Sequence, residues 1–348
     1  MQIITDINKW QRKDRTLVAI GNFDGLHLGH QALLQELLKQ SKAKQGISMV
    51  LTFEPHPLKV LSGFAPPLLT GSSRKERLLA QWGIDYLCKI PFDFTIADMA
   101  PNDFVRDILA DCLGAWKILV GFNFTFGHKG LGDACLLQQI AQKKEIEVTI
   151  IPAVSLPLAA YRREASTKNR KNDLTLNLKS QILNPGLQVS PVSSTAIRNY
   201  LSLGQVKEAN LMLGHAFSLE GQVVTGRKIG QALGFPTANL ALDLSLQIPA
   251  RGVYAVRAAL AGRIYHGAAN VGYRPTLGGA DESNLEVCLL DYEGEDFYGS
   301  HLHVSFDHFF RLEQSFSGIE QLRQQISHDY QNALDFYRSQ PLLAPIWS

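Results

Sequence analysis

The chain is poor in cysteine and has no long apolar run. Its cysteines, Cys88, Cys112, Cys135 and Cys288, are scattered and form no CxxC pair. This spacing argues against a disulfide framework and favours buried thiols in a reducing compartment. No stretch approaches the roughly 18 apolar residues of a transmembrane helix, and the first residues lack the features of a leader peptide. We therefore expect a cytoplasmic protein with no membrane partner.

Net charge is also small. A formal charge of +2 gives no reason to expect a nucleic-acid partner, because any basic surface would have to be local. The composition, 45% apolar and 19% charged, is that of an ordinary globular protein, so disorder is not expected. At 348 residues the chain is long enough for about two domains, each with its own core. The sequence carries no signal for an oligomeric state.

One glycine-punctuated turn stands out near the start. An apolar run at residues 17–20 leads into GNFDGLHLGHQ at 21–31, and apolar residues at helical spacing follow. Strand, turn and helix start together make an anion site, because unpaired backbone N–H groups and the helix dipole both favour a phosphate. His27 and His30 are three residues apart and can lie on one side of the helix start. A capping or core pair of histidines is the structural alternative, and no third zinc ligand stands at a recognisable spacing.

This turn resembles the HxGH signature of the nucleotidyltransferase superfamily, and its longer form resembles the FAD-synthesising branch. The resemblance implies that His27 and His30 hold the ATP phosphates and stabilise the charge that develops at the α-phosphorus. It also implies ATP contacts from Gly21, Phe23 and Asp24. Nucleotidyl transfer depends mainly on alignment and on donors aimed at phosphate oxygens, and this turn supplies both.

The first half alternates strands and helices. Apolar runs at 48–53, 86–90 and 117–120 predict buried strands, and a helix is expected with Ser72 or Ser73 as its N-cap. Helical spacing returns at 101–113. This alternation predicts a doubly wound, Rossmann-like α/β domain with a parallel sheet, in which ligands lie beyond the carboxyl ends of the strands.

The loop at 121–133, GFNFTFGHKGLGD, directly follows a predicted strand. Its glycines allow close approach of the backbone to a ligand, and its aromatic rings offer apolar surface. It resembles the GxNFxFGxxxxGD segment of bacterial FAD synthetases. The resemblance implies that Asn123 lies beside the nucleotide and that Phe124 and Phe126 border the flavin. A glycine-rich hairpin with aromatic packing is the alternative.

Residues 154–191 are rich in basic side chains and lack periodicity, so we expect an inserted, mobile loop there. The next stretch, Ser-Ser-Thr followed by Ala-Ile-Arg, opens a helix whose hydroxyls can cap it or contact a phosphate. It resembles SSTxIR, the second phosphate-binding signature of the same superfamily. The ATP contacts that the resemblance implies are Ser193, Ser194, Thr195 and Arg198.

The pattern changes near residue 214. Short apolar or β-branched runs now follow one another without helices, which predicts an antiparallel barrel. Helical spacing at 314–337 predicts a helix that packs against this barrel. The runs lie at 222–225, 253–260, 265–271, 285–290 and 302–306. We predict a first domain at 1–214 and a second at 215–340.

A second glycine loop lies at 226–239. Its backbone amides suit phosphate oxygens, and a threonine hydroxyl suits a Mg²⁺ ion that bridges phosphates. It resembles GxxxGxxxGFPTAN, the riboflavin kinase signature, which implies that Thr237 and Asn239 position Mg²⁺ with ATP. The alternative is a barrel turn closed by an Asx-type bond, so that the Pro-Thr-Ala-Asn stretch is a turn. The implied ATP contacts are Gly226, Lys228, Gly230, Gly234, Pro236, Thr237 and Asn239.

One carboxylate, Glu286, interrupts the apolar run at 285–290. If it points inward, it needs a use or a partner, and activation of a substrate hydroxyl is one such use. If it points outward, it is a surface glutamate. The segment resembles the kinase EVxxLD motif, which implies a base for the riboflavin 5′-hydroxyl. The stretch from Asn270 to Arg274 resembles the family's NxGxRPT loop near the flavin, with Arg274 suited to loop closure.

Together these ordered motifs resemble the bacterial family that combines riboflavin kinase and FAD synthetase. The resemblance implies a C-terminal Greek-key barrel with a terminal helix, and it implies Mg²⁺ with ATP as cofactor. Riboflavin and ATP would give FMN in the barrel, and FMN and a second ATP would give FAD in the first domain. Two alternatives stay open: an enzyme with only one of these activities, and a non-catalytic flavin-binding module.

Overall fold

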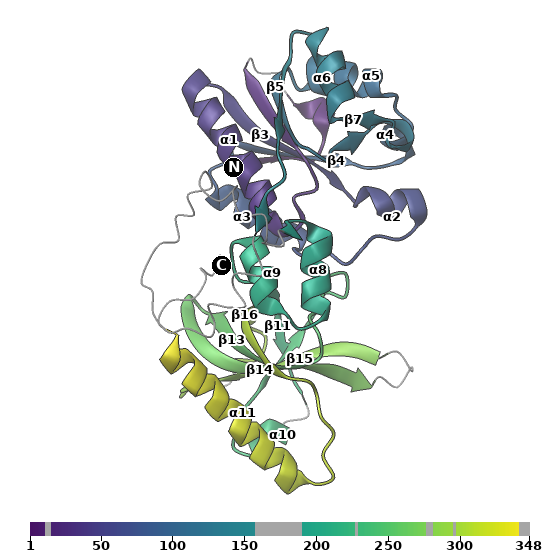
Figure 1. Ribbon diagram of the computed structural model, residues 1–348. Coiled ribbons are helices and arrows are strands. Elements are labelled where there is room, and N and C mark those ends of the chain that lie inside the picture. The colour runs from purple at the N-terminus through teal and green to yellow at the C-terminus, as the bar shows by residue number, and fades with distance from the viewer. Residues whose placement is uncertain (11–14, 157–189, 227–228, 276–280, 295–296, 341–348) are drawn as a thin grey trace, which may run out of the picture.

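The computed structural model describes residues 1–10, 15–156, 190–226, 229–275, 281–294 and 297–340. An α/β unit forms one end of the molecule and a β-barrel forms the other, with helices α8 and α9 between them (Figure 1). This confirms the predicted fold class. In the described part of the chain, no helix combines the length and the apolar run that a bilayer crossing requires.

The N-terminal sheet has six parallel strands in the order β1-β4-β3-β2-β5-β8. They are β1 (Gln2–Ile4), β2 (Thr16–Ile20), β3 (Ile47–Glu54), β4 (Tyr86–Pro91), β5 (Ala115–Gly121) and β8 (Glu147–Ile151). The chain moves outward from β2 through β3 to β4 and then returns to the other side of β2 with β5. The strand order therefore reverses between β2 and β5, where open α/β sheets bind their ligands.

Helices cover both faces of this sheet, and a separate apolar cluster lies under each face. Leu17 and Ala19 point into one cluster, and Val18 and Ile20 into the other, so β2 is buried on both sides. The helices are η1 (Ile7–Lys9), η2 (Asp24–Leu26), α1 (Leu28–Lys44), α2 (Pro57–Ser62), α3 (Ser72–Gln81), α4 (Phe94–Ala97), α5 (Pro101–Asp103), η3 (Phe104–Cys112), η4 (His128–Gly130) and α6 (Ala134–Gln142).

Three local predictions need correction. The N-cap of helix α3 is Gly71, which makes no side-chain capping bond, and not Ser72 or Ser73, which are already helical. The single helix expected at 101–113 is a short α-helix followed by the π-helix η3. All four cysteines are free, but Cys135 is exposed instead of buried.

The C-terminal barrel is closed and antiparallel, in the order β11-β12-β15-β14-β13-β16. Its strands are β11 (Ser218–Val224), β12 (Ala238–Ala241), β13 (Gly252–Leu260), β14 (Arg263–Pro275), β15 (Asp281–Leu289) and β16 (His301–Arg311). Strand β12 was not predicted from the sequence. Its first residues, Ala238 and Asn239, are strand residues and not part of a turn. Helix α10 (Ile229–Ala232) lies in the glycine loop, and α11 (Ile319–Ser339) packs along the outside of the barrel.

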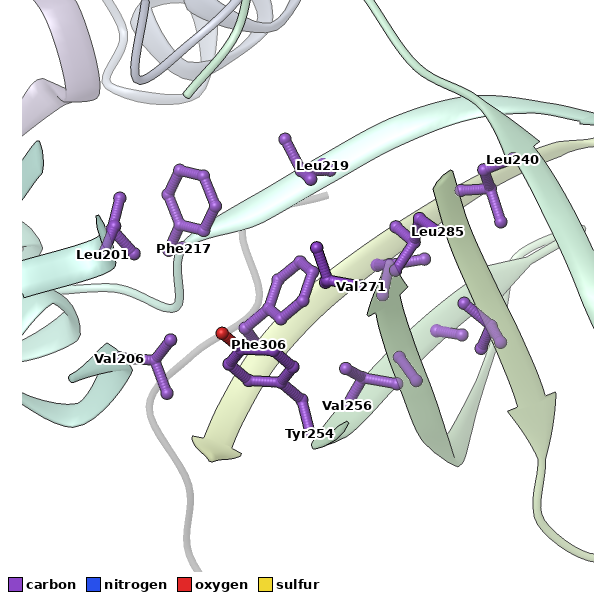
Figure 2. Close-up of a cluster of buried hydrophobic side chains, with 14 of the residues drawn as sticks. Leu201, Val206, Phe217, Leu219, Leu240, Tyr254, Val256, Val271, Leu285 and Phe306 are labelled. Atoms are coloured by element: carbon purple, nitrogen blue, oxygen red, sulfur yellow. The ribbon is translucent and has the colours of Figure 1, made fainter. Parts of the chain in front are cut away.

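The barrel core extends into the helices that join the two parts. Leu201 of α8 (Ser194–Ser202) and Val206 of α9 (Val206–Leu213) belong to the same buried cluster as Phe217, Tyr254 and Phe306. Figure 2 shows these side chains together. The two ring pairs that involve Phe306 have centroids 5.9 and 5.2 Å apart, an aromatic packing distance. Since this core is continuous, α8 and α9 are held against the barrel while their other side contacts the α/β unit.

The connection between residues 154 and 191 is described only at its ends. There, β9 (Ser155–Leu156) pairs antiparallel with β10 (Ser190–Pro191). The rest of the predicted insertion lies outside the described residues.

Candidate active sites

The histidine turn leaves the sheet at the point where the strand order reverses. Helix η2 follows β2, and His27 is the N-cap of α1, with its Nδ1 accepting a bond of 3.3 Å from the backbone N–H of His30. The two imidazole rings stack with centroids 3.7 Å apart and planes at 14°. The rings therefore lie on one side, as their spacing predicts. Because Nδ1 of His27 accepts, its proton is on Nε2, which is then a donor for a ligand.

Both histidines are electrostatically suited to be neutral donors. Burial lowers the pKa of His27 to about 4, and burial together with His27 lowers the pKa of His30 below its usual range. Phe23 is fully buried and packs against the His30 ring at 5.2 Å, so it supports that ring. Gly21 is half-buried, and its N–H donates to Leu51 O in β3. An approaching phosphate would raise both histidine pKa values, because an opposite charge favours the protonated ring.

Asp24 links this turn to the second signature, although the two are far apart in sequence. Its Oδ2 accepts from Arg198 Nη2 at 2.6 Å, and its Oδ1 accepts from the backbone N–H groups of Leu69 and Thr70. Ser194 Oγ donates to Asp24 O at 3.1 Å. Burial raises the pKa of Asp24, and Arg198 opposes this shift. The Asp24 carboxylate neutralises Arg198, so the positive charge of Arg198 is less available to a phosphate than the motif alone suggests.

The other members of that signature occupy the start of α8. Ser193 is the N-cap and accepts from Ala196 N at 3.2 Å, while Thr195 is exposed. Capping therefore accounts for one of the predicted phosphate contacts.

Lys75 lies beside the turn and was missed by sequence reasoning. Its Nζ donates to Asn22 O at 3.1 Å, and burial lowers its pKa against the attraction of Asp24 and Glu54. The side chain of Asn22 also contacts His56 Nε2 at 3.2 Å, which brings the loop after β3 to the same place. No signal in the sequence separates Lys75 from the neighbouring cations of α3, because its position depends on how α3 packs against η2.

The aromatic loop follows β5, the strand on the other side of the reversal. Asn123 is exposed there, and Phe124 is half-buried. Phe126 is buried, stacks on Phe124 at 5.5 Å and packs against Phe104 at 5.7 Å. Residues Thr125–Phe126 (β6) and Gly132–Asp133 (β7) form a small hairpin, which is the alternative that the sequence left open. Phe126 is part of the core, so of the three residues predicted to contact ligands in this loop, Asn123 and Phe124 are the accessible ones.

On the barrel, three polar residues line up across adjacent strands. Glu286 of β15 is opposite Asn239 of β12 and also opposite Asn270 of β14. Side chains directly opposite one another point to the same face of a sheet. Leu285 and Val287, the neighbours of Glu286, point into the barrel core, so this polar row lies on the outer face.

Glu286 is therefore not inside the barrel, yet it is only half exposed. Asn284 Nδ2 donates to Glu286 Oε1 at 2.9 Å and to Asn239 Oδ1 at 3.3 Å. One amide thus brings the carboxylate close to the buried Asn239. The row presents oxygen acceptors at one place on the barrel rim.

The glycine loop folds over this row, and two glycines are required for close approach. A Cβ at Gly226 would lie 2.1 Å from Asn239 Nδ2, and a Cβ at Gly230 would lie 2.5 Å from Phe235 O. Gly234 has a φ of +87°, which favours glycine. Pro236 is exposed, and Lys228 and the side chain of Arg274 lie outside the described residues.

The oxygen atoms of this rim fit a hard divalent cation. Thr237 and Asn239 are two residues apart at the start of β12, so they share the face of Glu286. Hydroxyl, amide and carboxylate oxygens are ligands that Mg²⁺ accepts, usually together with phosphate oxygens and water. Among the described residues no group of three or more His, Cys, Asp or Glu side chains could hold a metal alone. The donor set therefore suits an ion that arrives with a nucleotide.

Comparison with known proteins assigns one family to each part of the chain. The FAD synthetase family model matches residues 9–160, and the riboflavin kinase family model matches residues 213–337. The chain is 34% identical over 341 residues to a bifunctional riboflavin kinase/FMN adenylyltransferase of Escherichia coli (strain K12), covering 97% of this chain and 98% of that protein. The enzyme of the same name from Bacillus subtilis (strain 168) is 30% identical over 332 residues, or 94% of each chain.

A solved structure shares the fold over almost the whole length. It is described as a macrolide-efflux protein from Streptococcus pneumoniae and superposes with a TM-score of 0.78 at 27% identity, covering 95% of this chain and 97% of that one. Two matched family models, in the order of the two sites, and two relatives of matching length agree on the assignment. The chain belongs to the bifunctional riboflavin kinase/FMN adenylyltransferase family.

Proposed function

We propose that the two sites catalyse consecutive reactions on flavin. At the barrel rim, the γ-phosphoryl group of ATP passes to the 5′-hydroxyl of riboflavin, which gives FMN and ADP. At the histidine turn, a phosphate oxygen of FMN attacks the α-phosphorus of a second ATP, which gives FAD and pyrophosphate. The observation that carries this proposal is the presence of two phosphate-handling constellations, one in each matched family region.

At the histidine turn, His27 and His30 donate to phosphate oxygens and stabilise the charge that develops at the α-phosphorus. The stacked pair at the start of α1 supports this role, because the helix N-terminus adds positive potential at the same place. Lys75 adds a cation nearby, and Asp24 holds Arg198 in position. The remaining proposed contacts to ATP are Gly21, Phe23, Asn123, Ser193, Ser194 and Thr195. Phe124 borders the flavin, and Phe126 stacks on the Phe124 ring and supports it.

At the barrel rim, Glu286 accepts the proton of the riboflavin hydroxyl as that oxygen forms its bond to phosphorus. Its bond to Asn284 supports this role by fixing the carboxylate beside Asn239. Thr237 and Asn239 would hold Mg²⁺, which neutralises phosphate charge when bound. Asn270 and Arg274 contact the flavin, while the glycine loop with Lys228 and Pro236 encloses ATP. A cytoplasmic location, the absence of nucleic-acid and membrane partners, and the domain limits 1–214 and 215–340 stay predictions.

Product analysis of paired variants tests the division of labour. The chain is incubated with riboflavin, ATP and Mg²⁺, and FMN and FAD are resolved by chromatography. Replacement of His27 and His30 by alanine should slow FAD formation by about 10² to 10⁴ and leave FMN formation unchanged. Glu286→Gln should slow FMN formation by a similar factor and leave adenylylation of supplied FMN unchanged. His328→Ala and Glu293→Gln, which alter exposed residues, are matched controls.

Loss of both reactions in either variant, with the circular dichroism spectrum unchanged, would contradict two independent sites. FMN as the only product of the unaltered chain would favour an enzyme with kinase activity alone. Flavin binding with no product at all would favour a non-catalytic module.

A further inference from the structure

Side chains from three separate elements hold the backbone of the histidine turn. Ser194 Oγ of α8 donates to Asp24 O at 3.1 Å, His215 Nε2 lies 3.0 Å from Gly25 O, and Gln31 Nε2 donates to Leu26 O at 2.8 Å. These carbonyls are consecutive, and the next residue is His27. A carbonyl oxygen only accepts and a neutral imidazole carries one N–H, so the bond to Gly25 O is made by the tautomer with its proton on Nε2.

The turn needs such support because its backbone is strained. Phe23 and Leu26 have φ values of 50° and 41°, a region that side chains with a Cβ rarely adopt, and Gly25 has a φ of 83°. Residues in such conformations persist only when the surrounding structure over-determines them. A turn without its side-chain bonds would relax, and the position of the following histidines would change with it.

Two of these hydrogen bonds, those of Gln31 and His215, connect the turn to the junction with the barrel. Gln31 Nε2 donates to Leu213 O at 2.7 Å as well as to Leu26 O, so one amide joins the end of α9 to the turn. Gly214 follows with a φ of 72°, and a Cβ there would lie 2.6 Å from Leu28 Cδ2. His215 comes next and is 2% exposed. His215 belongs to the region that the riboflavin kinase family model matches, although its bond lies in the other site.

We infer that His215 and Gln31 are positioning residues for adenylyl transfer, which fix the carbonyls of Gly25 and Leu26 and thereby place His27 and His30. This inference rests on the proposed role of the two histidines. It makes the adenylyl-transfer site dependent on a residue at the start of the kinase region. A displacement of about 1 Å in a catalytic group is enough to lower a rate about 10²-fold.

The two ring nitrogens of His215 allow a sharp test. Nδ1 lies 3.1 Å from Ala216 O, whereas Nε2 reaches Gly25 O. In His215→Gln the amide nitrogen takes the place of Nε2, in His215→Asn it takes the place of Nδ1, and His215→Phe has neither nitrogen. Only the glutamine variant can restore the bond to the turn. Burial lowers the pKa of His215, so the comparison is made at neutral pH, where the ring is uncharged.

Each full-length variant is assayed for adenylylation of FMN and for phosphorylation of riboflavin. For His215→Phe and His215→Asn we expect kcat of adenylylation to fall about 10- to 100-fold, with KM for ATP changed by less than about threefold. For His215→Gln we expect kcat within about fivefold of the unaltered chain. Gln31→Leu should behave like His215→Phe. Gln40→Leu removes an amide from the same helix that donates to Glu36 and not to the turn, and it should have no effect. Phosphorylation of riboflavin should stay constant in all of them.

Equal adenylylation kcat in the glutamine and asparagine variants would overturn the inference, as would an unchanged kcat in the phenylalanine variant. Parallel loss of both reactions would also overturn it, because it would indicate general destabilisation. If the phenylalanine variant does not fold, the glutamine and asparagine pair decides. A His30→Ala variant is assayed beside these. If it loses adenylylation while the His215 variants retain it, only this inference fails, and if it retains adenylylation, the proposed function fails.

Discussion

Asp24 offers the most informative single perturbation of the N-terminal site. Its carboxylate is buried and accepts bonds from Arg198 and from two backbone N–H groups, at 2.6, 2.8 and 3.1 Å. In Asp24→Asn the remaining oxygen can keep the backbone bonds, but the charge opposite Arg198 is lost. The side chain of Arg198 is only 13% exposed, so its guanidinium cannot recover full hydration. Removing one partner of a buried pair costs about 3 to 5 kcal/mol, and we expect that loss here.

The assay is urea unfolding followed by tryptophan fluorescence. Three of the four tryptophans, Trp10, Trp82 and Trp116, precede residue 214 and report on the N-terminal unit. We also expect FMN adenylylation to fall by about 10²-fold, because Asp24 precedes the histidines in the same turn, while riboflavin phosphorylation stays constant.

Two further variants make the magnitude decisive. Asp103→Asn removes an exposed carboxylate that pairs with Arg106 at 2.7 Å, and such surface pairs contribute at most about 1 kcal/mol. The double variant Asp24→Asn with Arg198→Gln should be less destabilised than the sum of its single variants, by about 1 to 3 kcal/mol. A loss below 1 kcal/mol for Asp24→Asn alone, or strict additivity in the double variant, would refute the reasoning.

Three further outcomes follow from the two sites. Burial lowers the pKa of His27 from 6.5 to about 4. Between these pH values the unfolded chain therefore binds a proton that the folded chain does not, and stability falls as pH falls, by about 3 kcal/mol in all. The urea midpoints of the unaltered chain and of His27→Gln should therefore lie closer together at pH 4.5 than at pH 7. An equal difference between the two proteins at both pH values would contradict this. Gly226→Ala places a Cβ 2.1 Å from Asn239 Nδ2 and should lower the rate of FMN formation at least about tenfold. Gly318→Ala, whose Cβ would have no neighbour within 4 Å, should leave that rate unchanged. Equal rates in the two variants would contradict the loop geometry. Lys75→Met should raise KM for ATP in adenylylation about tenfold with the kinase KM unchanged, and an unaltered adenylylation KM would exclude a phosphate contact by Lys75.

Local sequence signals predicted the frame of both sites. Apolar runs located β2, β3, β4 and β5, because strands that are buried on both faces must be apolar throughout. The spacing of His27 and His30 predicted two imidazoles on one side of a helix start. Each of these features depends on residues that are close together in the chain, so the sequence alone could predict it.

Features that depend on distant partners could not be predicted. Strand β12 is short and contains two alanines, so it has little strand preference of its own, and it forms because it closes the barrel between β11 and β15. The bond from Arg198 to Asp24 joins residues that are 174 positions apart in the sequence, and no local pattern shows that the carboxylate neutralises this arginine. The direction of Glu286 was left open for the same reason. Alternation along a strand does not say which face a barrel encloses.

A crystal structure with a non-hydrolysable ATP analogue, Mg²⁺ and riboflavin tests the central claim most directly. We predict two nucleotides in each chain. One has its phosphates within hydrogen-bond distance of His27 and His30, and the other lies under the glycine loop with Thr237, Asn239 and Glu286 around its terminal phosphate and the flavin hydroxyl. A single nucleotide per chain at saturating concentration, or phosphates that leave both imidazoles without contact, would contradict the account.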